Sequence, residues 1–72
     1  MKFVIFCNAA NLKTYNNTWI VVAPNTSYKL LNIQFDEYGI IRSIVFSVNN
    51  DIVAFERSNV TGKFGSNFAL SA

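Results

Sequence analysis

The feature that most constrains the fold is a succession of short apolar runs, each bounded by residues that favour turns, mainly Asn, Gly and Pro. The runs are rich in β-branched and aromatic residues, which is typical of strands, and most are too short for helices. The polar stretch 8–17 has room for one short helical turn at most. We therefore predict an all-β chain with little helix and with strands at 2–7, 18–23, 28–35, 40–48, 52–57 and 64–70, the last after a loop around Gly62.

Two turns define the centre of this arrangement. The segment 36–39 has Asp at its first position and Gly at its fourth, which suits a type I turn closed by a left-handed glycine. Asn49 and Asn50 tolerate positive φ, so they suit a tight two-residue turn. The strands at 28–35, 40–48 and 52–57 are therefore expected to form an antiparallel meander.

The second turn also fixes a register. If Val48 pairs with Asp51, four large apolar residues come to lie opposite one another on one face of the sheet. This face is the predicted core, formed by Ile44, Phe46, Val53 and Phe55.

The segment 40–48 has apolar residues on both of its expected faces. Simple alternation places Ile40 with the predicted core and places Ile41 and Val45 on the opposite face. A second apolar face needs a cover, which a closed barrel, the stretch 8–17 or a second copy of the chain can supply. We expect a single domain, 1–72, built as a small antiparallel barrel or β-roll of five to six strands, with a two-sheet sandwich as the alternative. We also expect a homo-oligomer, most simply a dimer.

Composition excludes several classes of protein. Hydrophobic residues make up 51% of the chain and charged residues 14%, which excludes intrinsic disorder. The net charge of +2 excludes an acidic mimic of nucleic acid and does not support a strongly basic binder. No apolar run approaches the length of a membrane span, so no membrane partner is expected.

The chain also lacks most catalytic chemistry. It has no His, one Cys and four acidic residues, and it has no nucleotide-binding or nucleophile motif. We predict no catalytic residues, no metal, no cofactor and no enzymatic activity. Cys7 ends an apolar run, so it is expected to be a buried thiol, and a free thiol fits the cytoplasm.

Composition indicates an origin, and the absence of catalytic motifs indicates a class of function. Asn, Ile, Phe, Tyr and Lys, which AT-rich codons favour, provide 31 of the 72 residues. Met1 stands directly before the first predicted strand, so we expect a complete small reading frame. The hypothesis is a non-enzymatic binding protein from a phage or mobile element that inhibits a host protein in the host cytoplasm.

Exposed aromatic residues are the expected anchors of such a protein, because Trp, Tyr and Arg dominate interface hot spots. The candidates are Tyr15, Tyr28 and Tyr38, with Tyr38 the strongest because it lies in a turn. Trp19 lies in an apolar run and is predicted to be core. An alternative is an OB-like protein that binds single-stranded nucleic acid through aromatic side chains and a basic groove. The Lys and Arg residues of this chain, however, are scattered along the sequence.

Two arginines are the remaining candidates for binding. Extending the predicted register places Arg42 opposite Arg57, an arrangement that an anion between the two guanidinium groups would stabilise. The anion could be an Asp or Glu of a partner protein, a phosphate of a nucleotide that an oligomer of this chain sequesters, or a backbone phosphate of nucleic acid. The competing interpretation is that Asp36 and Glu56 neutralise the two arginines locally.

Overall fold

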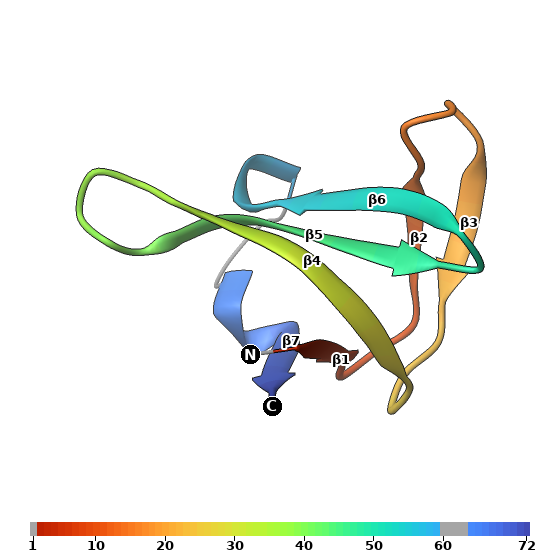
Figure 1. The fold of residues 1–72 in the computed structure, drawn as a ribbon, viewed down its shortest axis with the longest axis horizontal. Helices are drawn as coiled ribbons and strands as arrows, with labels where there is room; N and C mark the ends of the chain where they lie inside the picture. The colour runs from red at the N-terminus through yellow and green to blue at the C-terminus, as the bar shows by residue number, and fades with distance from the viewer. Residues whose placement is uncertain (1, 60–63) are drawn as a thin grey trace.

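The computed structural model describes residues 2–59 and 64–72, and the predicted loop around Gly62 lies outside these residues. The described chain is all-β apart from two short 3-10 helices (Figure 1). Its elements are β1 (Phe3–Phe6), β2 (Ala10–Lys13), β3 (Trp19–Val22), β4 (Ser27–Phe35), β5 (Ile41–Val48), β6 (Asp51–Glu56), η1 (Arg57–Asn59), η2 (Phe64–Ser66) and β7 (Phe68–Ser71). The predicted all-β class is confirmed.

The described residues form seven strands in two antiparallel sheets. Five of them make one sheet in the order β6-β5-β4-β1-β7, and β2 pairs with β3 in a separate hairpin. The predicted central meander is therefore confirmed as β4-β5-β6. Within the described residues β6 and β7 are the two edges of the sheet and do not pair with each other, so no closed barrel is present there.

Both predicted turns adopt the expected backbone conformation. Gly39 has a φ of 79°, and the N–H of Gly39 donates to the carbonyl oxygen of Asp36 over 3.1 Å. Asn49 and Asn50 have φ values of 49° and 70°, as a two-residue hairpin with the twist of its flanking strands requires. The register is also as predicted, with Val48 opposite Asp51.

Phenylalanine rings occupy the centre of the core. Phe6 of β1 lies 5.4 Å from Phe46 of β5 and 5.3 Å from Phe55 of β6, measured between ring centroids. The four predicted core residues of β5 and β6 are all buried, which confirms that prediction. The buried apolar residues of the described chain are Val4, Phe6, Val22, Ile44, Phe46, Val48, Val53, Phe55, Phe64 and Phe68.

The predicted second apolar face of the segment 40–48 is wrong. Gln34 pairs with Ser43 and Phe35 with Ile41, so Arg42 is an extra residue that shifts the alternation. Ile41 consequently packs against the core, and Ile40 is 59% exposed instead of buried. The other face of β5 carries two serines and Val45, so it does not need the apolar cover that motivated the expected oligomer.

The polar stretch 8–17 holds a strand, β2, where the sequence indicated at most a helical turn. Thr14 directly after β2 is buried, and it forms an antiparallel bridge with Val53 of β6. The hydroxyl groups of Thr14 and Thr18 lie 2.7 Å apart and stabilise the turn between β2 and β3. The hairpin thus lies against the β6 edge of the large sheet (Figure 1).

Two further burial predictions are wrong for one reason. Trp19 is 69% exposed and Cys7 is also exposed. Successive side chains of a strand point to opposite faces. In β3 it is Val22 that is fully buried, and in β1 it is Phe6, so Trp19 and Cys7 fall on the outward side.

Replacing Phe46 tests the core. Phe46→Ala should lower the free energy of unfolding by about 3–5 kcal/mol, because it removes a fully buried ring from the centre of the cluster. Urea denaturation measures this loss. Tyr38→Ala, at a position 80% exposed, is the matched control and should change stability by less than about 0.5 kcal/mol. Equal effects of the two substitutions would contradict the described core.

Candidate functional site

The end of the β4–β5 hairpin carries three large, exposed apolar side chains. Phe35, Tyr38 and Ile40 are 55%, 80% and 59% exposed, within six residues of chain. The hairpin projects beyond the rest of the molecule, at the left of Figure 1. We call these three residues the hairpin tip. Tyr38 lies in the turn and is exposed as predicted.

The carboxylate of Asp36 organises the tip. Its Oδ1 accepts hydrogen bonds from the backbone N–H of Tyr38 over 2.9 Å and of Ile40 over 3.0 Å. The backbone N–H of Asp36 donates to the carbonyl of Ile40 over 2.8 Å. An aspartate that binds its own turn in this way favours one backbone conformation over the alternatives. The tip side chains therefore emerge from a constrained turn.

Arg57 connects this turn to the body of the protein. Its Nη1 donates to Oδ2 of Asp36 over 3.0 Å and to the carbonyl oxygen of Ile41 over 3.4 Å. The pKa of Asp36 is lowered, first by the N–H of Ile40 and further by Tyr38 and Arg57. Both oxygens of the carboxylate are thus engaged in its ionised form.

The predicted direct opposition of Arg42 and Arg57 is wrong. The β5–β6 ladder ends at Ser43 and Glu56, and Arg57 begins η1 instead of continuing the strand. Both arginines nevertheless line one open pocket of about 570 Å³. All six of its lining residues are polar: Gln34, Arg42, Ser43, Glu56, Arg57 and Ser58.

Charge in this pocket is almost balanced. Asp36 neutralises Arg57 through a salt bridge, and Glu56 contributes a second carboxylate to the pocket wall. Arg42 lies 3.5 Å from the amide oxygen of Gln34, which also accepts a hydrogen bond from Ser43 over 2.8 Å. The pocket can therefore offer guanidinium donors to a small polar ligand, but without a strong positive field.

The other two tyrosines lie away from the tip. The hydroxyl of Tyr28 accepts a hydrogen bond from the N–H of Ala23 over 2.8 Å, and its half-buried ring packs against Phe46. Tyr28 thus has a structural role. Tyr15 is 65% exposed in the turn between β2 and β3, on a different hairpin from the tip.

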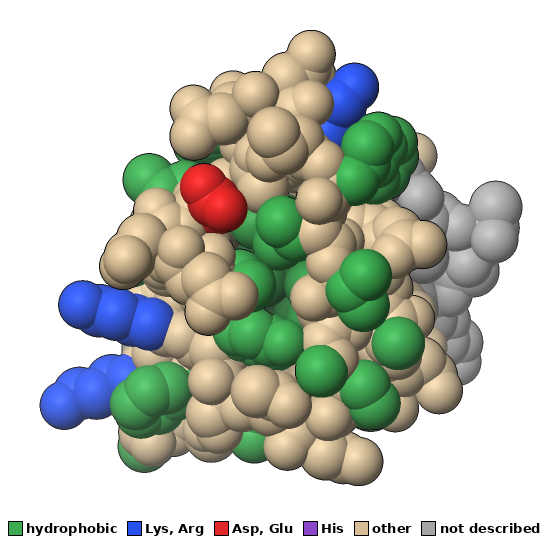
Figure 2. All heavy atoms as spheres, turned by 90° about the vertical axis from the view of Figure 1, so that its right-hand side faces the viewer, with side chains coloured by type: hydrophobic (Ala, Val, Ile, Leu, Met, Phe, Trp, Pro, Cys, Tyr) green, Lys and Arg blue, Asp and Glu red, His purple; other side chains and the backbone are tan. Residues whose placement is uncertain are grey.

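Sequence reasoning missed Phe35, Ile40 and Trp19 as surface residues. The first two follow from the bulge at Arg42, for which the sequence carries no clear signal. The alternation of β3 could have placed Trp19 outside, beside Val21. The ammonium of Lys13 lies 5.6 Å from the centroid of the Trp19 ring. Figure 2 looks onto the β2–β3 side of the molecule, where hydrophobic side chains gather in the middle and cationic ones lie at the margin.

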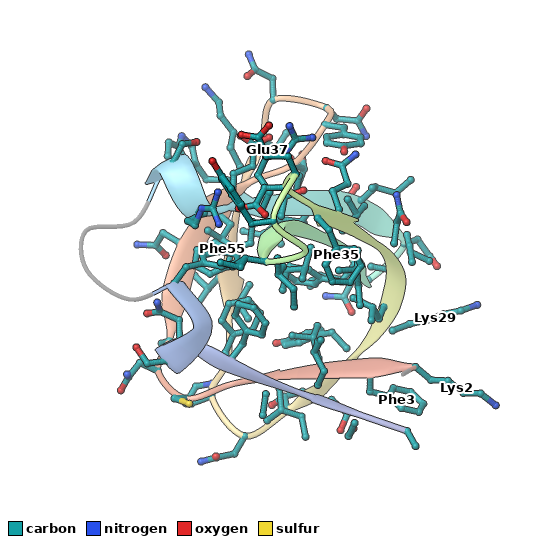
Figure 3. The ribbon with its side chains drawn as sticks, turned by 90° about the vertical axis from the view of Figure 1, so that its left-hand side faces the viewer. Lys2, Phe3, Lys29, Phe35, Glu37 and Phe55 are labelled. Atoms are coloured by element: carbon teal, nitrogen blue, oxygen red, sulfur yellow. The ribbon has the colours of Figure 1, made fainter. Side chains whose placement is uncertain are left out.

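The basic residues of the described chain do not line one common groove. Lys2 and Lys29 project from the same side of the molecule beside Phe3 (Figure 3). Lys13 lies with Trp19 in a separate pocket. None of these three lysines lines the pocket that the two arginines share. A continuous basic track with interleaved aromatics, which single-stranded nucleic acid requires, is not formed by these residues.

Residues 2–59 and 64–72 contain no group of three His, Cys, Asp or Glu side chains that could hold a metal ion. Nor does this described part include a helix with the length and hydrophobicity needed to cross a bilayer. Comparison with protein families, with curated proteins and with solved structures finds no significant match to the chain.

Acidification tests the organisation of the tip. Because the pKa of Asp36 is lowered in the folded chain, its stabilising contribution is complete above the unfolded value, about 3.9, and is lost as pH falls through the lower folded value. The amide resonances of Tyr38 and Ile40 should therefore shift with a midpoint below pH 3.9 in an NMR titration. Asp36→Asn should abolish this titration. A midpoint at or above 3.9 would contradict the described hydrogen bonds.

Proposed function

We propose that this chain is a non-enzymatic protein-binding module that holds its partner with the hairpin tip. The observation that supports this function is the exposure of Phe35, Tyr38 and Ile40 on a projecting and internally hydrogen-bonded turn. Soluble domains usually bury such side chains or scatter them singly, and clusters of them commonly mark interaction surfaces.

Preorganisation explains why a small tip can suffice. Binding proteins lose affinity when loops and side chains must be ordered on association. Here Asp36 constrains the turn and Arg57 attaches it to the body, so the backbone of the turn is already ordered in the free protein. Tyr38 has few rotatable bonds and combines an apolar ring with a hydroxyl, which suits an anchor in a partner's pocket.

The partner expected from this chemistry is a protein with a concave apolar pocket. A projecting tip that fills a pocket acts by occlusion, which fits the hypothesis of a phage or mobile-element inhibitor of a host protein. The exposed thiol of Cys7 is compatible with the reducing cytoplasm of such a host.

Affinity capture with tip variants tests this function. The immobilised protein is exposed to lysates of low-GC bacterial hosts, and retained proteins are identified by mass spectrometry. A Phe35→Ala/Tyr38→Ala variant should lose a stoichiometric partner that the wild type retains, with affinity reduced at least tenfold, because it removes the two aromatic anchors. Tyr15→Ala, which removes an equally exposed tyrosine on another hairpin, is the matched control.

Two outcomes would oppose the proposal. In one, the wild type retains no stoichiometric protein from any of the lysates. In the other, the double variant retains the same partner with unchanged affinity while Tyr15→Ala loses it, which would move the binding surface to the β2–β3 hairpin.

A second candidate function, binding of a small anionic ligand such as a nucleotide, is favoured by the pocket that Arg42 and Arg57 share. Calorimetry with a nucleoside diphosphate distinguishes the two functions. Binding that Arg42→Ala abolishes, with the capture result unchanged, would support the pocket. Absence of heat at millimolar ligand would remove this candidate.

A further inference from the structure

β7 is a short edge strand that carries neither charged residues nor proline. The segment from Ser66 to Ala72 contains no charged residue and no proline. Natural proteins normally place such residues on exposed edges to prevent pairing with other chains. The opposite edge, β6, carries Asp51 and Glu56 and is partly covered by the β2–β3 hairpin. The two edges of the sheet therefore differ in their charge and in how far other strands cover them.

The ladder with β1 determines which groups the open edge presents. The N–H of Cys7 donates to the carbonyl of Asn67 over 3.0 Å, and these two residues are opposite one another when the register of β1 and β7 is extended. In an antiparallel ladder, residues that bond to the same neighbour alternate along the strand. Ala69 therefore faces β1 with its main-chain groups, and the N–H and C=O groups of Phe68 and Leu70 face the open edge. No other described strand pairs with them.

An apolar groove accompanies this edge. It has a volume of about 360 Å³ and is lined by Ile40 of the hairpin tip, by Arg57 of η1 and by residues of β5, η2 and β7, namely Ile41, Phe64, Gly65, Phe68 and Leu70. Among the described residues that line it, Arg57 is the single charged one, and Asp36 neutralises it. The groove thus lies beside unpaired main-chain groups, and its described lining carries almost no net charge.

We propose that a second copy of this chain pairs with β7 in antiparallel orientation, about a two-fold axis at Ala69. Phe68 of each copy then pairs with Leu70 of the other copy. These two pairs allow about four main-chain hydrogen bonds between the copies. The two five-stranded sheets join into one continuous sheet, and side chains at the joint cover both grooves. This proposal does not depend on the function proposed for the hairpin tip.

Charge favours a second copy over a charged peptide as the occupant. In a two-fold interface every residue lies near its own counterpart, so a charged residue there meets a like charge. β7 avoids this repulsion because it is entirely neutral, and the described lining of the groove has no net charge to attract an acidic or basic peptide. A four-residue strand is a small contact, so the dimer should be weak and should dissociate on dilution.

Ala69→Lys tests this arrangement. Ala69 is exposed, and its side chain lies on the outward face of the sheet, so the substitution should leave the monomer folded. In the dimer it would place two ammonium groups against each other at the two-fold axis, where the Cα atoms approach to about 4.5 Å. Ala9→Lys, at an exposed position outside the strands, is the matched control.

Light scattering coupled to size-exclusion chromatography measures the mass, and circular dichroism verifies the fold. At several hundred micromolar the wild type and Ala9→Lys should approach twice 8.1 kDa, and Ala69→Lys should remain at the monomer mass. The amides of Phe68 and Leu70 should exchange at least tenfold more slowly in the concentrated wild type than in the dilute one. A wild type that is monomeric throughout, or a folded Ala69→Lys that dimerises equally well, would overturn the proposal.

Discussion

The packing of Phe6 against aromatic rings from distant strands is the contact on which the fold depends. Phe6 lies in β1, next to one edge of the five-stranded sheet, yet its ring contacts Phe46 and Phe55 of β5 and β6 at the other side. It also lies 6.1 Å from Phe68 of β7. The sheet must curl for these rings to meet. A chain of 72 residues has a small margin of stability, so one ring of this kind represents a large part of it.

Curling around this cluster has two consequences for the surface. The core reaches only part of the way along β4 and β5, so the end of their hairpin extends beyond it and carries Phe35 and Tyr38 into solvent. The curl also leaves β7 as an edge that is not joined to β6 within the described residues. The proposed partner surface and the proposed self-association surface are both direct results of where the core ends.

The central meander could be predicted from the sequence because its signals are local. Asp36, Gly39 and the pair Asn49-Asn50 define two turns, and the apolar pattern between them then fixes the register and the core. These turns depend on few residues, and each residue has a known backbone preference. The exposure of Tyr38 follows from the same reasoning, since a turn residue is rarely covered.

The remaining features depend on contacts that are distant in the sequence. A single extra residue at Arg42 reverses which side chains of β5 face the core, and a bulge of this kind depends on the paired strand. The strand β2 is too polar to be recognised alone, and it is stabilised by its pairing with β3. The hydrophobicity of Trp19 predicts a core position, and the alternation of β3 places it outside once Val22 is known to be the residue that the core buries. The hydrogen bond between Arg57 and Asp36 likewise joins residues that are 21 positions apart in the sequence.

The central claim is that the core ends before the hairpin tip, and that Asp36 and Arg57 nevertheless keep the tip in one conformation. Measurement of ¹⁵N relaxation across the chain tests this claim most directly. We expect backbone order parameters of about 0.85 at residues 36–40, equal to those of the buried segment 44–48. Values below about 0.6 at residues 36–40, with the buried segment rigid, would contradict the account, because the tip would then not be preorganised.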